Sequence, residues 1–149
     1  MGKINFTIEK MLGSDAKQIA DLGKRTKELQ IDDSINQYYS EETLKNLIKD
    51  GNHILLVAKI KDKLIGFVIF LYHEYFKEIY LSDIVVEKEH RGSGAGKALF
   101  DKATELAKDK KPEWEWALVQ EENENMQNIL SSRGFKKGKK FYFFYKDTI

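Results

Sequence analysis

The sequence contains no cysteine and only one proline, Pro112. Without cysteine the chain cannot form a disulfide framework, a thiolate zinc site or a thiol nucleophile. Its three histidines, His53, His73 and His90, fall in different predicted elements and show no His-x-x-x-His spacing. We therefore expect no metal site.

An excess of charge of one sign is also missing, as are long apolar runs. Lys plus Arg number 25 and Asp plus Glu 24, for a formal net charge of +1, which argues against nucleic acid as a partner. The longest apolar stretch, residues 64–72, is far short of the ~20 residues that span a bilayer. The first twenty residues show no signal peptide. We expect a cytoplasmic protein that does not interact with membranes.

The length of 149 residues suits a single domain over 1–149, with no repeat or linker in it. Hydrophobic periodicity and turn residues predict strands and helices in the order β-α-α-β-β-β-α-β-α-β-β. This order predicts an α/β fold with a central mixed sheet and helices on both faces. The predicted segments are strand 4–8, helices 14–29 and 40–51, strands 54–60, 64–72 and 78–86, helix 94–110, strand 114–119, helix 123–133 and a hairpin of 135–137 with 141–146.

The most informative stretch is a glycine-rich turn between a predicted strand and a predicted helix. Gly92, Gly94 and Gly96 stand at alternate positions where an amphipathic helix opens. Glycines allow a tight turn and a close approach of the backbone to a ligand. The free N–H groups and the dipole of a helix start attract anions, and Arg91 and Lys97 add full charges. The turn therefore predicts a phosphate or pyrophosphate site, although such a turn can also serve packing alone.

Two common phosphate loops do not fit this turn. A Walker A loop needs a glycine five positions before its Gly-Lys pair and a hydroxyl residue after it, but Arg91 and Ala98 stand there. A dinucleotide-binding fold needs Gly-x-Gly-x-x-Gly after its first strand. Here the glycines follow the fourth predicted strand with a different spacing.

The residues Arg91-x-x-Gly94-x-Gly96 match the Q/R-x-x-G-x-G/A signature of the GNAT superfamily of N-acetyltransferases. The chain resembles this family over essentially its whole length, because the order of elements is also the family's. The resemblance implies binding of acetyl-CoA. It places the pantetheine arm along the backbone of three residues and the pyrophosphate on the loop. The residues so implied are Ile84, Val85 and Val86 for the arm, and Arg91, Gly92, Ser93, Gly94, Ala95, Gly96 and Lys97 for the pyrophosphate.

A second cofactor contact follows from the segment that runs from Asn123 through Leu130 to Gly134-Phe135, which resembles the family's second CoA motif. The resemblance implies that Asn123 hydrogen-bonds the pantetheine. An asparagine at the start of a helix can also be only an N-cap. Both interpretations stay open from the sequence.

Acetyl transfer to an amine requires that the amine lose a proton. For an ammonium with a pKa of about 10.4, deprotonation at pH 7 costs roughly 4.6 kcal/mol. Asp83 directly precedes the implied thioester-binding segment and is our candidate base, since apolar neighbours would raise its pKa. The alternative is a structural aspartate. By the period of two, Glu78 and Tyr80 face the opposite side of this strand from Asp83.

The family's usual proton donor to the departing thiolate is a tyrosine four residues before the Gly-Phe pair, where this chain has Leu130. The sequence therefore departs from the pattern at the general acid. Tyr142, on the last predicted strand, is our candidate replacement, with Tyr145 as another. Both can also simply pack.

The resemblance places the acceptor pocket near the connection of the first two helices. Asp32, Asp33 and Tyr38 lie there and suit a cationic amine by charge and cation–π contact, unless the loop is merely solvated. We predict an acetyl-CoA-dependent N-acetyltransferase that acts on a primary amine of a small molecule, such as a polyamine-like cation, by direct transfer in a ternary complex.

Three alternatives stay open. The first is a non-catalytic acyl-CoA-binding sensor or regulatory module, and the second is an acetyltransferase for protein N-termini or lysines. The third is a nucleotide phosphate-binding protein. A homodimer is expected by analogy with relatives alone.

Overall fold

The computed structural model describes residues 5–32 and 37–148. The described helices and strands follow one another in the predicted order up to the last helix. They are β1 (Thr7–Lys10), α1 (Ala16–Lys24), α2 (Glu41–Asp50), β2 (Ile54–Ile60), β3 (Lys63–His73), β4 (Glu78–Val86), α3 (Ala95–Lys108), β5 (Trp114–Trp116) and α4 (Glu124–Ser132). Short 3-10 turns lie between them: η1 (Gly13–Asp15), η2 (Lys27–Leu29), η3 (Glu74–Phe76) and η4 (Lys88–His90).

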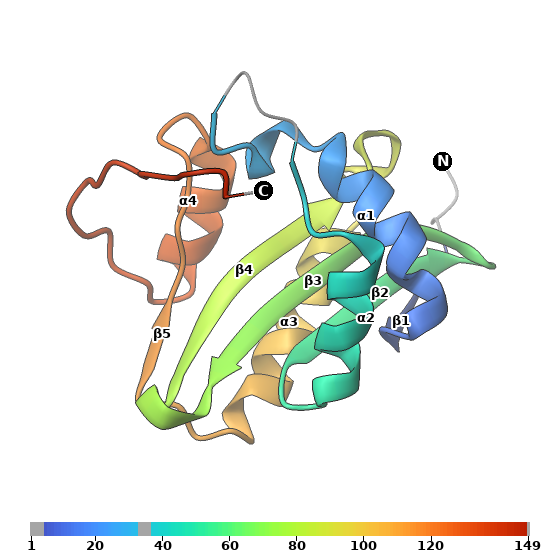
Figure 1. Ribbon diagram of the computed structural model, residues 1–149, viewed down its shortest axis with the longest axis horizontal. Helices are drawn as coiled ribbons and strands as arrows, with labels where there is room; N and C mark the ends of the chain where they lie inside the picture. Colours follow the sequence, from blue (N-terminus) through green and yellow to red (C-terminus); the bar gives the residue numbers. More distant parts are fainter. Residues whose placement is uncertain (1–4, 33–36, 149) are drawn as a thin grey trace.

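The strands form one mixed sheet in the order β1-β2-β3-β4-β5, in which β5 alone of these runs parallel to its neighbour. Helices α1 and α2 lie on one face and α3 and α4 on the other (Figure 1). This arrangement confirms the predicted fold class. No helix in the described ranges combines the length and the apolar character needed to cross a membrane.

Strand β3 shows why the sheet has a core on each face. Its alternate side chains Phe67 and Ile69 pack with α1 and α2, while Val68 and Phe70 pack with α3. All four are buried, as a continuous apolar run in a sheet with two covered faces requires. The central strands are therefore fixed from both sides, which gives β4 a rigid support.

A β-bulge interrupts β4 at Ser82. Ile69 of β3 lies opposite Asp83, and the next residue of β3 lies opposite Leu81, so Ser82 is an extra residue. Leu81 belongs to the cluster on the α3 face, whereas Val85 belongs to the cluster on the α1–α2 face. Alternation therefore reverses at the bulge. Strict alternation, assumed from the sequence, predicted that Asp83 and Tyr80 face opposite sides of the sheet. Because of the bulge, both lie on the α1–α2 face.

The predicted C-terminal hairpin is not formed: the described residues after α4 contain no strand, and β5 ends at Trp116 rather than at residue 119. Strand propensity is realised only against a partner edge. Side-chain contacts hold the segment instead. Lys140 Nζ lies 2.6 Å from Glu121 Oε1, and the Tyr145 hydroxyl donates to Asp32 Oδ2 at 3.0 Å. The aromatic side chains of 141–144 stay exposed.

Candidate functional site

Strands β4 and β5 separate along the sheet, and the candidate site lies where they part. They pair only from Glu78 and Trp114 to Tyr80 and Trp116, and then diverge (Figure 1). At the last pair the rings of Tyr80 and Trp116 stack, with centroids 4.1 Å apart and planes at 14°. Beyond this point β4 offers a backbone edge that β5 does not cover. An extended, amide-rich ligand can add to such an edge as a strand would.

The far end of this opening is tied to the helix connection on the α1–α2 face. Gln120, four residues past the end of β5, donates from Nε2 to the carbonyl of Gln30 at 2.7 Å and to that of Lys27 at 3.3 Å. These bonds hold the chain that follows β5 apart from β4. These hydrogen bonds therefore stabilise the separation of β4 from the chain that follows β5.

The glycine-rich turn follows the C-terminal end of β4. At two of its positions the backbone conformation requires glycine. Gly92 has φ 83° and Gly94 has φ 91°, in the left-handed region that side-chain-bearing residues avoid. No atom lies within 4 Å of a Cβ built on either of them. The space beside both residues is open to a ligand.

The first turn of α3 presents free donors to that space. Gly94, Gly96 and Lys97 make no backbone N–H hydrogen bond within the described ranges, and the first helical bond is from Ala98 N to Gly94 O at 3.0 Å. Ser93 Oγ accepts from Ala95 N at 3.3 Å, which fixes the turn. Free amides at a helix start, with the positive end of its dipole, suit a diphosphate. The turn therefore fits the diphosphate site that the sequence predicted.

The two cations of the loop are paired with carboxylates at the surface. Arg91 donates from Nη1 to Glu28 Oε1 at 3.0 Å and from Nε to the Val86 carbonyl at 3.1 Å. Lys97 Nζ lies 2.7 Å from Asp101 Oδ2. Exposed pairs of this kind contribute only ~0–1 kcal/mol, so a diphosphate can compete for both cations.

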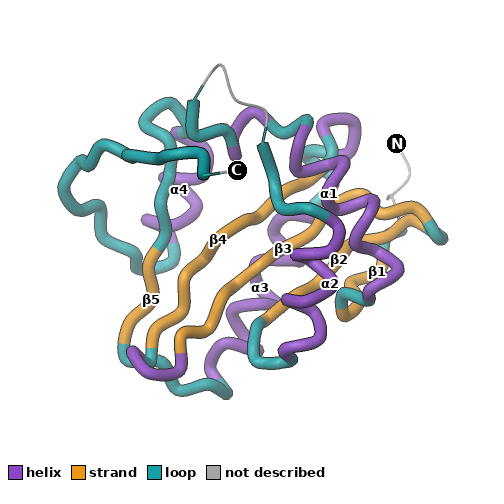
Figure 2. Tube along the Cα trace, viewed as in Figure 1, coloured by secondary structure: helices purple, strands orange, loops and turns teal. Residues whose placement is uncertain are grey.

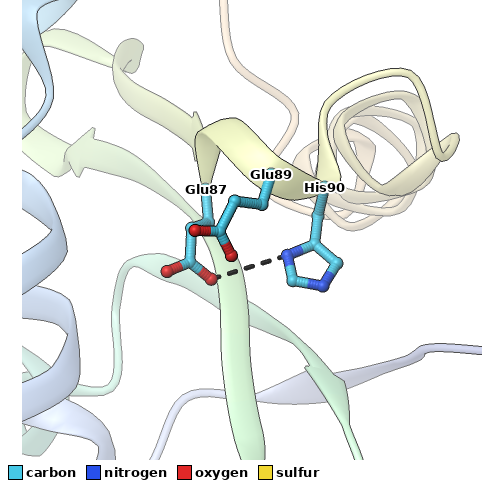
Figure 3. Close-up of side chains that lie close together, drawn as sticks. All are labelled: Glu87, Glu89 and His90. Carbon is cyan, nitrogen blue, oxygen red and sulfur yellow. Dashed lines mark ion pairs between the residues drawn. The ribbon is translucent and has the colours of Figure 1, made fainter.

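Three side chains of the turn between β4 and the loop lie close together: Glu87, Glu89 and His90 (Figure 3). His90 Nδ1 is 3.5 Å from Glu87 Oε2. Glu87 also pairs with Arg25 at 3.7 Å and with Lys63 at 3.6 Å. These ligand types could hold a metal ion, but two cations already neutralise Glu87. We interpret Glu87 as a brace that ties the start of the loop to Arg25 and Lys63 by ion pairs.

Asp83 is the buried acid of the site. It is 9% exposed, and its Oδ2 accepts a hydrogen bond from the Tyr38 hydroxyl at 2.8 Å. Burial raises the pKa of Asp83 from 3.8 to about 6, and hydrogen bonds from Tyr38 and Ser82 partly oppose this rise. Burial and the nearby Asp83 charge also raise the pKa of Tyr38 strongly. Asp83 can therefore exchange a proton near neutral pH while Tyr38 stays protonated.

Aromatic rings surround this carboxyl group. The Tyr39 ring meets the Tyr38 ring edge-on, with centroids 5.1 Å apart, and the Tyr80–Trp116 stack stands on the same face of the sheet. Burial, and then the charge of Asp83, raise the pKa of both Tyr39 and Tyr80. Helices α1 and α2 lie over β2 and β3 and leave the lower part of β4 and β5 uncovered (Figure 2). Tyr39 and Tyr80 therefore lie close enough to Asp83 for its charge to affect them, on the face that also holds Tyr38.

Of the predicted acceptor residues, the structure brings only Tyr38 to Asp83. Asp32 lies at the surface and accepts from Tyr145, and Asp33 lies outside the described residues. The candidate acid Tyr142 lies on the C-terminal segment and is 92% exposed, so it is not among the buried side chains near Asp83. Its proposed role therefore has no support from its position.

The second cofactor motif forms as a helix start. Asn123 is the N-cap of α4, and its Oδ1 accepts from Met126 N at 3.1 Å. The N-cap interpretation is confirmed, and a bond from the side-chain amide to pantetheine stays a prediction. Leu130 is 8% exposed within the core cluster on the α3 face, so its position faces the core.

Sequence reasoning missed the bulge at Ser82 and the pairing of Tyr38 with Asp83. No local signal marks either of them. The bulge depends on the register with β3, and the pair joins two residues 45 positions apart.

Comparison with known proteins decides the family. The model of the acetyltransferase (GNAT) family matches residues 19–135 of the chain. The chain belongs to the GNAT acetyltransferase family. The sequence predictions of this family, of the acyltransferase class and of acetyl-CoA as co-substrate are thereby confirmed. No curated protein matches the sequence.

Solved structures of other acetyltransferases share the fold of this GNAT acetyltransferase. PaiA N-acetyltransferase from Thermoplasma acidophilum in complex with coenzyme A is 22% identical with a TM-score of 0.73, over 89% of this chain and 90% of that one. The aminoglycoside acetyltransferase AAC(6')-Iy with a bisubstrate analogue is 19% identical with a TM-score of 0.71, over 97% and 99%. The ribosomal-protein-S18-alanine N-acetyltransferase from Escherichia coli is 18% identical with a TM-score of 0.72, over 91% and 80%.

The buried setting of Leu130 leads to a prediction for the variant Leu130→Tyr. Because the added ring must fit into the packed α3 face, we expect a loss of about 1–3 kcal/mol in the free energy of unfolding. We expect no gain in turnover, since a side chain at this position packs in the core cluster on the α3 face. Urea unfolding and release of CoA thiol measure the two effects. Ser131→Tyr, at an exposed position of α4, is the control. Higher turnover at unchanged stability would contradict this placement of residue 130.

Proposed function

We propose that this GNAT acetyltransferase moves an acetyl group from acetyl-CoA to a primary amine of a small cationic molecule. Transfer is direct, within a ternary complex, and Asp83 is the general base. One observation carries the proposal. A buried carboxyl group with a pKa near neutrality stands near tyrosine rings on β4, three residues beyond the last pair of that strand with β5.

The cofactor would be held by the parts of the chain that leave backbone groups free. The free amides of Gly92, Gly94, Gly96 and Lys97 would bind the diphosphate, and Arg91 would turn to it from Glu28. The amides of Ser93 and Ala95 hydrogen-bond within the turn and would hold its shape around the ligand. The backbone of Ile84, Val85 and Val86 would bind the pantetheine arm, with Asn123 on the opposite side. When bound, acetyl-CoA supplies an activated acyl group with a thiolate leaving group.

Asp83 would accept the proton that the ammonium must lose before its nitrogen can attack. A carboxylate with a pKa of about 6 is a stronger base than an ordinary aspartate by about 3 kcal/mol, yet it is mostly ionised at pH 7. A free N–H on the uncovered edge of β4 would stabilise the negative charge that develops on the acyl oxygen. Tyr38 would hold the carboxylate in place through the attack.

The surroundings of Asp83 support a cationic acceptor. The faces of Tyr39, Tyr80 and Trp116 attract ammonium groups, and Asp83 attracts them by charge. Solved relatives include both aminoglycoside acetyltransferases and acetyltransferases of a ribosomal protein's alanine. The aromatic surroundings of Asp83 favour the small cation here. A cytoplasmic location and a homodimer, both expected from the sequence, stay predictions.

A paired comparison of acceptors tests this proposal. With acetyl-CoA, we expect 1,5-diaminopentane to release CoA thiol with a kcat/KM about 10-fold above that of 5-aminopentanol. The second ammonium adds a cation–π contact of about 1–2 kcal/mol that the hydroxyl cannot make. Peptides with a free N-terminus or an internal lysine are the competing acceptors.

Faster turnover of the peptides would favour a protein acetyltransferase. No turnover of any amine, with acetyl-CoA binding intact by calorimetry, would favour a non-catalytic acyl-CoA-binding module. Either outcome would overturn the proposed acceptor class.

A further inference from the structure

The ring of Tyr38 occupies a slot that depends on the absence of a side chain at residue 23. A Cβ built on Gly23 would lie 2.3 Å from Cδ2 of Tyr38 and 2.5 Å from Cε2. The Phe67 ring of β3 packs nearby, with centroids 6.1 Å apart. Tyr38 is therefore held between α1 and the sheet.

The backbone conformation of α1 does not require glycine at residue 23. Gly23 is buried in the last turn of a regular helix, and its φ is not in the left-handed region. A glycine inside a helix costs up to about 1 kcal/mol relative to alanine. The close approach of the Tyr38 ring is the feature that requires it.

The hydroxyl group at the far end of the Tyr38 ring holds Asp83, the proposed base. The Tyr38 hydroxyl donates to Asp83 Oδ2 at 2.8 Å, across 45 residues of sequence. A ring needed only for packing could be phenylalanine, because a buried hydroxyl without a partner is costly. The titratable side chains that face Asp83 are Tyr38 from the segment before α2, its neighbour Tyr39, and Tyr80 from β4.

We propose that Tyr38 is a positioning residue for Asp83, and that Gly23 is present in α1 to admit the Tyr38 ring. The inference rests on the proposed function for its catalytic meaning, because Asp83 is the proposed base. The geometry itself can be tested without any substrate. The sequence suggested Tyr38 as a ligand of the acceptor amine. Its hydroxyl is engaged with Asp83, so a contact with the acceptor, which stays a prediction, would be made by the ring.

The test is a pH titration of the Asp83 carboxyl carbon by NMR in the protein labelled with 13C-aspartate. Tyr38→Phe removes a hydrogen bond that favours the carboxylate, so the Asp83 midpoint should rise by about one pH unit. Gly23→Ala displaces the ring and should raise the midpoint in the same direction. Gly13→Ala is the matched control, because no atom lies within 4 Å of a Cβ there. It should leave the midpoint unchanged.

A double variant isolates the steric contact. In a Tyr38→Ala background the ring is gone, so adding Gly23→Ala should produce no further shift of the Asp83 midpoint. Circular dichroism confirms that each variant is folded. A wild-type midpoint in Gly23→Ala, or an additive shift in the double variant, would overturn the role of Gly23. A wild-type midpoint in Tyr38→Phe would overturn the role of Tyr38.

Kinetics separates this inference from the proposed function. With an accepted amine, the acid limb of kcat should move to higher pH in Tyr38→Phe by the same interval as the NMR midpoint, with little change in the KM for the amine. If the NMR midpoints move as expected but no amine is acetylated, the positioning of Asp83 stands and the proposed reaction fails.

Discussion

The variant Gly94→Glu is expected to lose binding of CoA while the protein stays folded. Gly94 has φ 91°, and no atom lies within 4 Å of a Cβ built on it. A glutamate side chain would enter the space where the diphosphate is proposed to lie. Its negative charge would also oppose the ligand at the amides of Gly96 and Lys97. We expect an affinity at least about 100-fold weaker, which corresponds to about 2.7 kcal/mol. Calorimetry with CoA measures it.

The control for this variant is Gly51→Glu. Gly51 ends α2 with φ 74°, so the variant adds the same charge and a similar backbone strain away from the loop. Its affinity for CoA should equal that of the wild type, and both variants should keep the circular dichroism of a folded protein. An unchanged affinity in Gly94→Glu would remove the assignment of the loop to the diphosphate.

The variant Asp83→Asn is expected to lower kcat by about 10²–10⁴-fold, the range for loss of a general base. Asparagine has nearly the same shape and can still accept from Tyr38, so the KM for acetyl-CoA should change little. The wild-type rate should depend on pH in a matching way. Asp83 works only when ionised, and burial raises its pKa to about 6. Turnover should therefore fall as pH drops through 6, and this acid limb should be absent in the variant.

The control is Asp62→Asn, which alters an exposed aspartate in the turn between β2 and β3. Its rate and its pH profile should match those of the wild type. Full turnover in Asp83→Asn, or an acid limb that persists there, would show that another group accepts the proton. The assay is thiol release across pH 5 to pH 9 with a saturating amine.

The sequence predicts the parts of this site that depend on local chemistry. The glycines at 92 and 94 indicate a turn because their backbone conformation excludes other residues, and the amphipathic helix after them indicates free amides. The order of strands and helices follows from hydrophobic periodicity. These signals were sufficient for the mixed sheet and for the predicted phosphate loop.

Features that depend on distant pairing could not be predicted in this way. The bulge at Ser82 follows from the register of β4 against β3, and it decides which face Asp83 occupies. The hydroxyl of Tyr38 reaches Asp83 because α1 has a glycine where the ring passes. The C-terminal aromatics illustrate the converse. Their strong strand propensity was misleading because no neighbouring edge pairs with them.

The burial of Asp83 also sets a thermodynamic limit on the protein. In the unfolded chain this carboxyl titrates at its ordinary pKa of 3.8, whereas in the folded protein it titrates at about 6. Between these values the native state retains a proton that the unfolded chain has released, so the free energy of unfolding decreases as pH rises through this interval. At neutral pH the decrease is about 3 kcal/mol, a large share of the ~5–15 kcal/mol that holds a typical domain together. The apolar clusters on both faces of the sheet must therefore supply enough stability to keep an ionised acid out of water.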